Sequence, residues 1–103
     1  MIRHIALFKF KPGYDWEHPR VAAAEALAVR IGAEVPELLE WRAGRNVTDR
    51  PVAYDYAIVG LVPDEEALGR YLVHPFHQRS ADLWKEISTW VIADLVEDPA
   101  AAA

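Results

Sequence analysis

The segment Arg70–Arg79, RYLVHPFHQR, brings together side chains that can perform acid–base chemistry. It holds Tyr71, His74 and His77, with Pro75 between the two histidines. A neutral imidazole can take a proton near pH 7, and a phenol can donate a hydrogen bond to an oxygen that gains negative charge. Tyr71 and His77 are therefore candidates for removing a proton next to a carbonyl group. The alternative is structural, with Tyr71 capping a helix end and His77 bonded to the backbone.

A metal site is a second alternative for the same segment, because two histidines and a carboxylate can form an open site. However, the spacing in HPFH is three with a proline inside, and no HExxH motif, cysteine cluster or acidic loop accompanies it. The glycines form no phosphate-binding pattern. Trp41, Trp84 and Trp90 are interpreted as core or interface residues rather than a flavin or haem cradle. The sequence therefore predicts neither a metal nor a cofactor.

The remaining polar candidates lie in predicted strands or at helix ends. His4 is in the middle of a strand, where it is either a core group or a pocket residue. His74 precedes Pro75 and is therefore pushed out of helical geometry, which favours a capping role. Asp94 could orient a histidine, but pairing with an arginine is preferred, as it is for Asp55. His18 is expected to be exposed near a helix start.

The hydrophobic pattern predicts four strands and three helices. The first strand alternates, with Phe8 and Phe10 on one face and Ile5 and Leu7 on the other. Pro19 is tolerable only in the first turn of a helix, and Asp15 could cap that helix. Asp64 is a good cap for the next helix, and Pro75 can begin a third. The expected strands cover 2–11, 38–47, 52–62 and 89–97. The first helix is expected to follow Asp15 and to end at Pro36, the second lies within 64–73 with Asp64 as its cap, and the third begins at Pro75 and carries Ile87.

The order strand, helix, strand, strand, helices, strand predicts an α+β, ferredoxin-like split βαβ fold with a four-stranded antiparallel sheet. The helices can cover only one face of this sheet, yet the strands are apolar on both faces. A second subunit packed sheet to sheet is the simplest cover for the other face. The sequence thus predicts a homodimer, formed through the face that carries Phe8 and Phe10.

Composition narrows the class of protein further. The chain has 103 residues, no cysteine and a net charge of −5, which predicts one domain over residues 1–97 and a frayed tail over 98–103. The basic residues are scattered, which argues against nucleic-acid binding. The apolar stretch at the N-terminus is too short and too interrupted by charge for a signal peptide or membrane span. We expect a cytoplasmic protein without a membrane partner.

Four stretches together resemble the stress-responsive α/β-barrel (Dabb) domain family: IRHIALFKFK, AGRNV, YDYAIVG and YLVHPFHQ. The resemblance covers the chain from Ile2 to about Val96, and its most specific element is YxxHPxH. It implies a dimeric α/β barrel built from ferredoxin-like subunits.

The family includes stress-associated proteins and olivetolic acid cyclase, a cofactor-free polyketide cyclase. The resemblance implies that the catalytic tyrosine and histidine of that cyclase fall on Tyr71 and His77, and that His4 is a pocket residue. A further pocket histidine falls near Tyr56, so this chain departs from the cyclase there. Tyr56 and His74 are nevertheless expected to border the pocket together with His4. The expected function is binding of a small hydrophobic organic ligand, with cyclase or lyase chemistry on a β-keto compound. A non-enzymatic stress-associated oligomer and a cofactor-free monooxygenase are the alternatives.

Overall fold

The chain folds into a four-stranded antiparallel sheet covered by three helices, and the computed structural model describes residues 1–98. The elements are β1 (Ile2–Phe10), α1 (Pro19–Glu34), β2 (Glu40–Arg45), β3 (Tyr56–Val62), α2 (Glu65–Val73), α3 (Pro75–Ile87) and β4 (Ser88–Val96). The strand order is β2-β3-β1-β4, and every neighbouring pair is antiparallel. The predicted ferredoxin-like α+β fold is confirmed. Beyond Asp98, the predicted tail lies outside the described residues.

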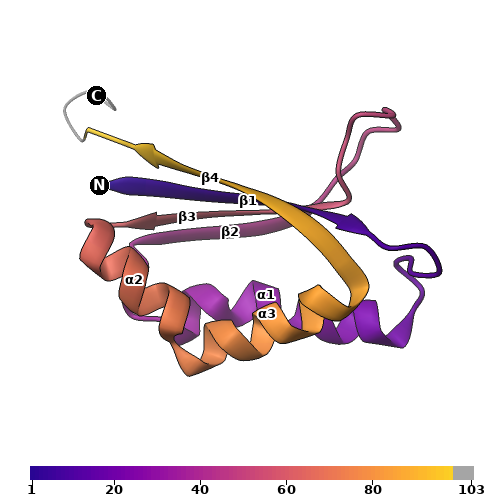
Figure 1. Cartoon of the computed structure of the whole chain (residues 1–103), viewed down its shortest axis with the longest axis horizontal. Helices are drawn as coiled ribbons and strands as arrows, with labels where there is room; N and C mark the ends of the chain where they lie inside the picture. Colours follow the sequence, from indigo (N-terminus) through magenta and orange to yellow (C-terminus); the bar gives the residue numbers. More distant parts are fainter. Residues whose placement is uncertain (99–103) are drawn as a thin grey trace.

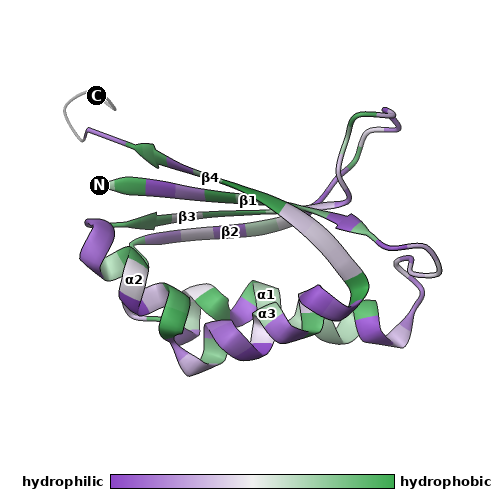
Figure 2. Cartoon of the chain, in the orientation of Figure 1, coloured by the Kyte–Doolittle hydropathy of each residue, from purple (hydrophilic) through white to green (hydrophobic). Residues whose placement is uncertain are grey.

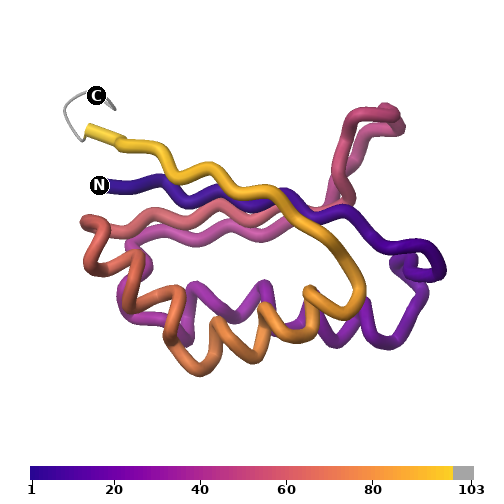
Figure 3. The backbone as a smooth tube through the Cα atoms, in the orientation of Figure 1, coloured from indigo at the N-terminus to yellow at the C-terminus, as the bar shows by residue number. Residues whose placement is uncertain are grey.

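All three helices lie on one side of the sheet, and the two terminal strands run side by side (Figures 1 and 3). The alternation of β1 decides what the helices cover: His4, Ala6 and Phe8 are buried, whereas Leu7 and Lys9 are exposed. Small side chains on α1, including Ala24 and Ala28, are also buried, and they allow the helix to pack close to its neighbours.

The predicted dimer face is wrong. Phe8 is only 8% exposed, and its ring centroid lies 4.6 Å from that of Trp84 on α3, so the helices of the same chain cover this face. The open face is the opposite one, where Leu7 pairs with Val91 across β1 and β4. Leu7, Val91 and Leu95 are all at least one-third exposed, and apolar residues follow both strands in Figure 2. Both faces of β1 are apolar, so alternation alone did not reveal which of them the helices cover.

The first helix begins one turn later than its predicted cap. His18, and not Asp15, caps α1: its Nδ1 accepts a hydrogen bond from the backbone N–H of Arg20. The Asp15 carboxylate instead accepts from the backbone N–H of Glu17 in the preceding turn. His18 is therefore half-buried rather than exposed. Pro19, at the first helical position, is the reason, because its fixed φ suits that position and leaves residue 18 as the cap.

The junction between the second and third helices agrees with the sequence. Asp64 caps α2 and accepts from the N–H of Ala67 at 2.8 Å. The chain changes direction at His74, whose backbone is extended, and Pro75 begins α3. Two separate helices, rather than one long helix, therefore carry Tyr71 and His77.

The second and third strands are shorter than predicted. β2 ends at Arg45 and β3 begins at Tyr56, and the stretch between them is a loop that projects beyond the sheet (Figure 3). Asn46 starts this loop by bonding Thr48 through its side chain, a pattern that competes with strand pairing. Within residues 1–98, no helix has the length and apolar run that crossing a bilayer requires.

Candidate active site

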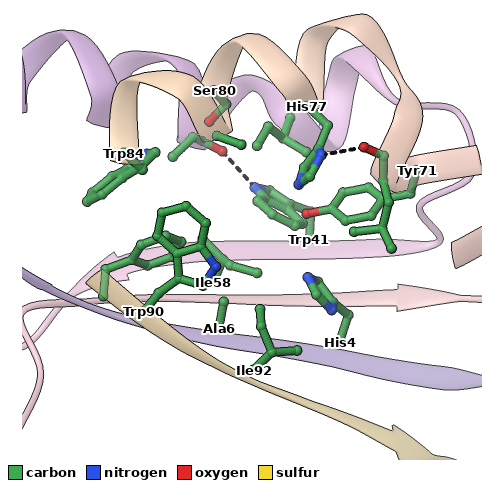
Figure 4. A pocket seen from close by; sticks show the side chains of 15 residues that line it. His4, Ala6, Trp41, Ile58, Tyr71, His77, Ser80, Trp84, Trp90 and Ile92 are labelled. Carbon is green, nitrogen blue, oxygen red and sulfur yellow. Dashed lines mark hydrogen bonds between the residues drawn. The ribbon is translucent and has the colours of Figure 1, made fainter. Parts of the chain in front are cut away.

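A cavity of about 240 Å³ lies between the sheet and the helices. Its walls are mostly apolar and include three tryptophans, one each from β2, α3 and β4 (Figure 4): Trp41, Trp84 and Trp90. The Nε1–H of Trp41 donates to the carbonyl oxygen of Ala28 at 2.9 Å, which fixes this indole. Ile92 on β4 also lines the cavity and is 49% exposed, because β4 is an edge strand of the sheet.

The cavity brings together three of the residues singled out in the sequence: His4, Tyr71 and His77. Tyr71 lies between the two histidines. Its ring centroid is 5.2 Å from that of His4 and 4.3 Å from that of His77. Because these residues come from β1, α2 and α3, the cluster forms only when the helices pack on the sheet.

Tyr71 is suited to donate a hydrogen bond. The side chain is 2% exposed, and its hydroxyl makes no hydrogen bond to the other side chains drawn in Figure 4. Burial raises the pKa of the Tyr71 phenol well above its ordinary value, and the negative charge of Asp94 adds to the effect. The hydroxyl therefore keeps its proton at neutral pH.

His77 is suited to accept a proton. Its Nδ1 lies 3.0 Å from the carbonyl oxygen of Leu72. A carbonyl oxygen can only accept, so Nδ1 carries the hydrogen and the lone pair of the neutral ring is on Nε2. Burial lowers the pKa of His77, and the nearby His4 and His74 lower it further against the opposing effect of the Leu72 carbonyl. In Figure 4 the second ring nitrogen points toward the cavity, on the side of the Tyr71 hydroxyl.

His4 is held by the carboxylate of Asp94, for which the sequence favoured an ion pair with an arginine instead. Asp94 is the cross-strand partner of His4 in the β1–β4 register, and its Oδ1 lies 2.5 Å from Nδ1 of the histidine. The arginine interpretation is wrong for Asp55 as well, because that carboxylate accepts from the backbone N–H of Phe10 at 2.8 Å. An ionised Asp94 can only accept, so His4 presents its Nε2 as the free nitrogen.

Two predicted pocket residues lie outside the cavity lining. Tyr56 is packed in the core, where its ring stacks on Trp84 at 4.9 Å between centroids, and burial raises its pKa to about 12. His74 caps α3, accepting from the N–H of Phe76 at 3.1 Å. Ser80 also lines the cavity, although no pattern in the sequence predicted it there. Asp94, which the sequence left open as a carboxylate that could orient a histidine, lies on the face of β4 that also carries Trp90 and Ile92.

A metal ion finds no ready site among the described residues, where no group of three or more histidine, cysteine, aspartate and glutamate side chains converges. The cavity instead offers a phenol, two imidazoles and a serine within aromatic and aliphatic walls. Such a site can orient a small organic molecule and move a proton to or from it.

Comparison with known proteins places the chain among proteins of the same fold. It is 47% identical over 94 residues to an uncharacterized protein of Streptomyces coelicolor, covering 91% of this chain and 97% of that one. A dimeric ferredoxin-like protein of unknown function from Thermobifida fusca superposes with a TM-score of 0.82 at 24% identity, covering 93% of this chain and 90% of that one.

A hydroxynitrile lyase from Passiflora edulis superposes with a TM-score of 0.78 at 16% identity, covering 95% of this chain and 94% of the lyase. At these identities the two structural likenesses concern the fold alone. The sequence profile of the stress responsive A/B barrel domain matches residues 2–97. The chain therefore belongs to the stress responsive A/B barrel domain family.

Proposed function

We propose that this protein binds a small, mostly apolar organic molecule in its cavity and catalyses cofactor-free proton transfer on it. The reaction class is that of a cyclase or lyase acting on a β-keto compound. His77 acts as the general base, and Tyr71 donates a hydrogen bond to the oxygen that gains charge. His4 borders the reacting atoms from the sheet side.

The placement of Tyr71 between two histidines, at the wall of one apolar cavity, carries this proposal. A proton acceptor and a hydrogen-bond donor must both be close to the reacting atoms, and an apolar surrounding strengthens their electrostatic effect. The lowered pKa of His77 keeps the ring neutral, and the raised pKa of Tyr71 keeps the phenol protonated. Both groups are thus in the protonation state that their roles require at neutral pH.

The chemistry in outline breaks one C–H bond. Nε2 of His77 takes the proton from the carbon next to a carbonyl group, and the electron pair of that bond forms the enolate. The Tyr71 hydroxyl stabilises the enolate oxygen, and the imidazolium returns its proton to the product. Asp94 accepts from Nδ1 of His4 and fixes the orientation of that ring, so the free nitrogen of His4 faces the bound molecule.

We also propose that the working form is a homodimer. Its structural neighbours from Thermobifida fusca and Bacteroides fragilis are described as dimeric. The open face of the sheet carries a row of half-exposed apolar side chains, which a second copy would cover.

Hydrogen–deuterium exchange at the methyl group of acetophenone, followed by NMR in D₂O, tests the proton transfer without knowledge of the natural substrate. The wild type should accelerate the exchange. His77→Asn should lower the catalysed rate by about 10²–10⁴. Tyr71→Phe should lower it by about 10² or more while binding of the ketone is preserved.

His18→Asn is the matched control, because it removes a histidine outside the cavity lining and asparagine can still cap α1. This variant should exchange acetophenone as fast as the wild type. Equal rates for the wild type and His77→Asn would overturn the catalytic role. If acetophenone is bound without exchange, the protein is a binding protein instead, in line with the stress-associated alternative.

A further inference from the structure

A second recess, of about 340 Å³, lies beside the cavity between α2 and the ends of β1 and β4. We call it the α2–β4 groove. Its lining includes Ile2, Glu65, Leu68, Leu72, Asp94 and Val96. Leu72, which is 44% exposed, lines both the groove and the cavity and so lies where the two meet. Asp94 lines the groove, while its carboxylate bonds His4 inside the cavity.

The charged side chains that line the α2–β4 groove and the cavity are all negative. Two carboxylates, Glu65 and Asp94, line the α2–β4 groove, and neither lysine nor arginine lines the groove or the cavity. The arginines on the neighbouring elements are engaged elsewhere. Arg3 contacts Glu97 and Glu40, and Arg70 contacts Glu37. A negatively charged molecule that moved from the groove into the cavity would pass two carboxylates and then lose its hydration without a counter-charge.

We propose that the α2–β4 groove is the entrance to the cavity, that Leu72 forms its inner gate, and that Glu65 and Asp94 make the site selective for uncharged over anionic ligands. This inference deepens the proposed function by naming the charge class of its substrate: a neutral ketone or ester rather than a carboxylate, sulfonate or phosphate.

The field of Asp94 already acts inside the cavity, because the same carboxylate contributes to the raised pKa of Tyr71. A ligand anion beside Tyr71 would feel the same repulsion. A gate at Leu72 is compatible with the role of His77 as the base. His77 contacts the main-chain carbonyl of Leu72 and not its side chain, so the side chain can be replaced without loss of that contact.

Quenching of tryptophan fluorescence tests the route independently of any ligand, because three of the four tryptophans line the cavity. Low ionic strength is required, since the screening length is then about 30 Å at 0.01 M. Acrylamide, which is neutral, should reach the tryptophans better than iodide. Glu65→Gln should raise the iodide quenching constant about two-fold or more and leave acrylamide quenching unchanged.

Glu66→Gln is the matched control, since it changes the net charge equally but lies outside the groove lining. It should change iodide quenching less than Glu65→Gln does. Leu72→Ala should raise acrylamide quenching, whereas Val73→Ala, on a neighbouring exposed residue outside both recesses, should not. Equal effects of the two glutamate variants, or no effect of Leu72→Ala, would overturn the inference.

A pair of ligands of nearly the same shape gives the second readout: methyl 4-acetylbenzoate and 4-acetylbenzoate. The neutral ester should bind at least about 10-fold more tightly than the carboxylate, as measured by tryptophan fluorescence. Glu65→Gln should reduce this difference in affinity between the two ligands. Equal affinity for both would overturn the charge selectivity. Binding without proton exchange would count against the proposed catalysis alone, so the two failures are distinguishable.

Discussion

The Nδ1 atom of His77 lies 3.0 Å from the carbonyl oxygen of Leu72, and this contact leaves Nε2 as the basic nitrogen. The ring is also partly buried, which lowers its pKa from the ordinary value of 6.5. The folded protein therefore binds the proton less readily than the unfolded chain does. Below pH 6.5, the unfolded state gains protons that the folded state does not.

The first prediction concerns pH. The free energy of unfolding should decrease as the pH falls below about 6.5 and stop changing, as far as His77 is concerned, below its folded-state pKa. Urea denaturation of the wild type and His77→Asn between pH 5 and 8 checks this. The variant should lose this part of the pH dependence. A wild-type stability that rises on acidification through this range, relative to the variant, would contradict the assignment.

The second prediction concerns the open face of the sheet. Val91 is 49% exposed and lies opposite Leu7, where a sheet-to-sheet dimer would bury roughly 1,200–2,000 Å² in total. Val91→Lys should weaken the dimer by at least about 10-fold, because it places a charge in an apolar contact. Val29→Lys, on the outer side of α1 and 54% exposed, should leave the dimer intact. Light scattering at micromolar concentration measures both, and a monomeric wild type would refute the proposed dimer.

The third prediction concerns the junction of α2 and α3. His74→Ala should lower the free energy of unfolding by about 0.5–2 kcal/mol, because the N–H of Phe76 loses its partner. His74→Asn should restore most of that loss, since asparagine is a good cap. Pro75→Ala should cost no more than about 1 kcal/mol, because its main effect is to free the unfolded chain. Chemical denaturation would speak against the capping role if alanine and asparagine at residue 74 were equally stable.

The sequence was most informative where a local rule decides the outcome. The period of two in β1 predicted that His4 and Phe8 share a face, and the fixed φ of Pro75 predicted a new helix. Which face the helices cover was not accessible, because both faces of β1 are apolar and the choice depends on how distant elements pack. The prediction of a dimer through the Phe8 face failed for this reason.

In the candidate site, too, the sequence predicted what local spacing decides and not what the pairing of distant elements decides. The YxxHPxH spacing singled out Tyr71 and His77, which the structure places at one cavity wall. The contact between His4 and Asp94 depends on the register of two strands 90 residues apart in the sequence, and no local pattern fixes such a register. Tyr56 has an apolar ring and a polar hydroxyl, so its residue type suits a pocket wall as well as the core. The sequence therefore could not predict that it stacks on Trp84 in the core.

The last prediction compares two helical glycines that should respond to alanine with opposite signs. Around Gly69 in α2, an added Cβ would meet nothing within 4 Å, so Gly69→Ala should raise the free energy of unfolding by about 0.5–1 kcal/mol through helix propensity. At Gly32 in α1, the same Cβ would lie 2.6 Å from Cβ of Trp41, an atom tied to the backbone of β2. The overlap should outweigh the gain in propensity, so Gly32→Ala should lower stability by about 1–3 kcal/mol.

Because Trp41 also lines the cavity, Gly32→Ala should in addition change the near-ultraviolet circular dichroism, whereas Gly69→Ala should leave that spectrum as it is. Urea denaturation measures the stability of both variants, and their near-ultraviolet spectra show whether the surroundings of Trp41 have changed. A Gly32→Ala variant as stable as Gly69→Ala would mean that α1 can move away from β2 at no cost, and the close packing that holds this wall of the cavity would then not be a constraint on its shape.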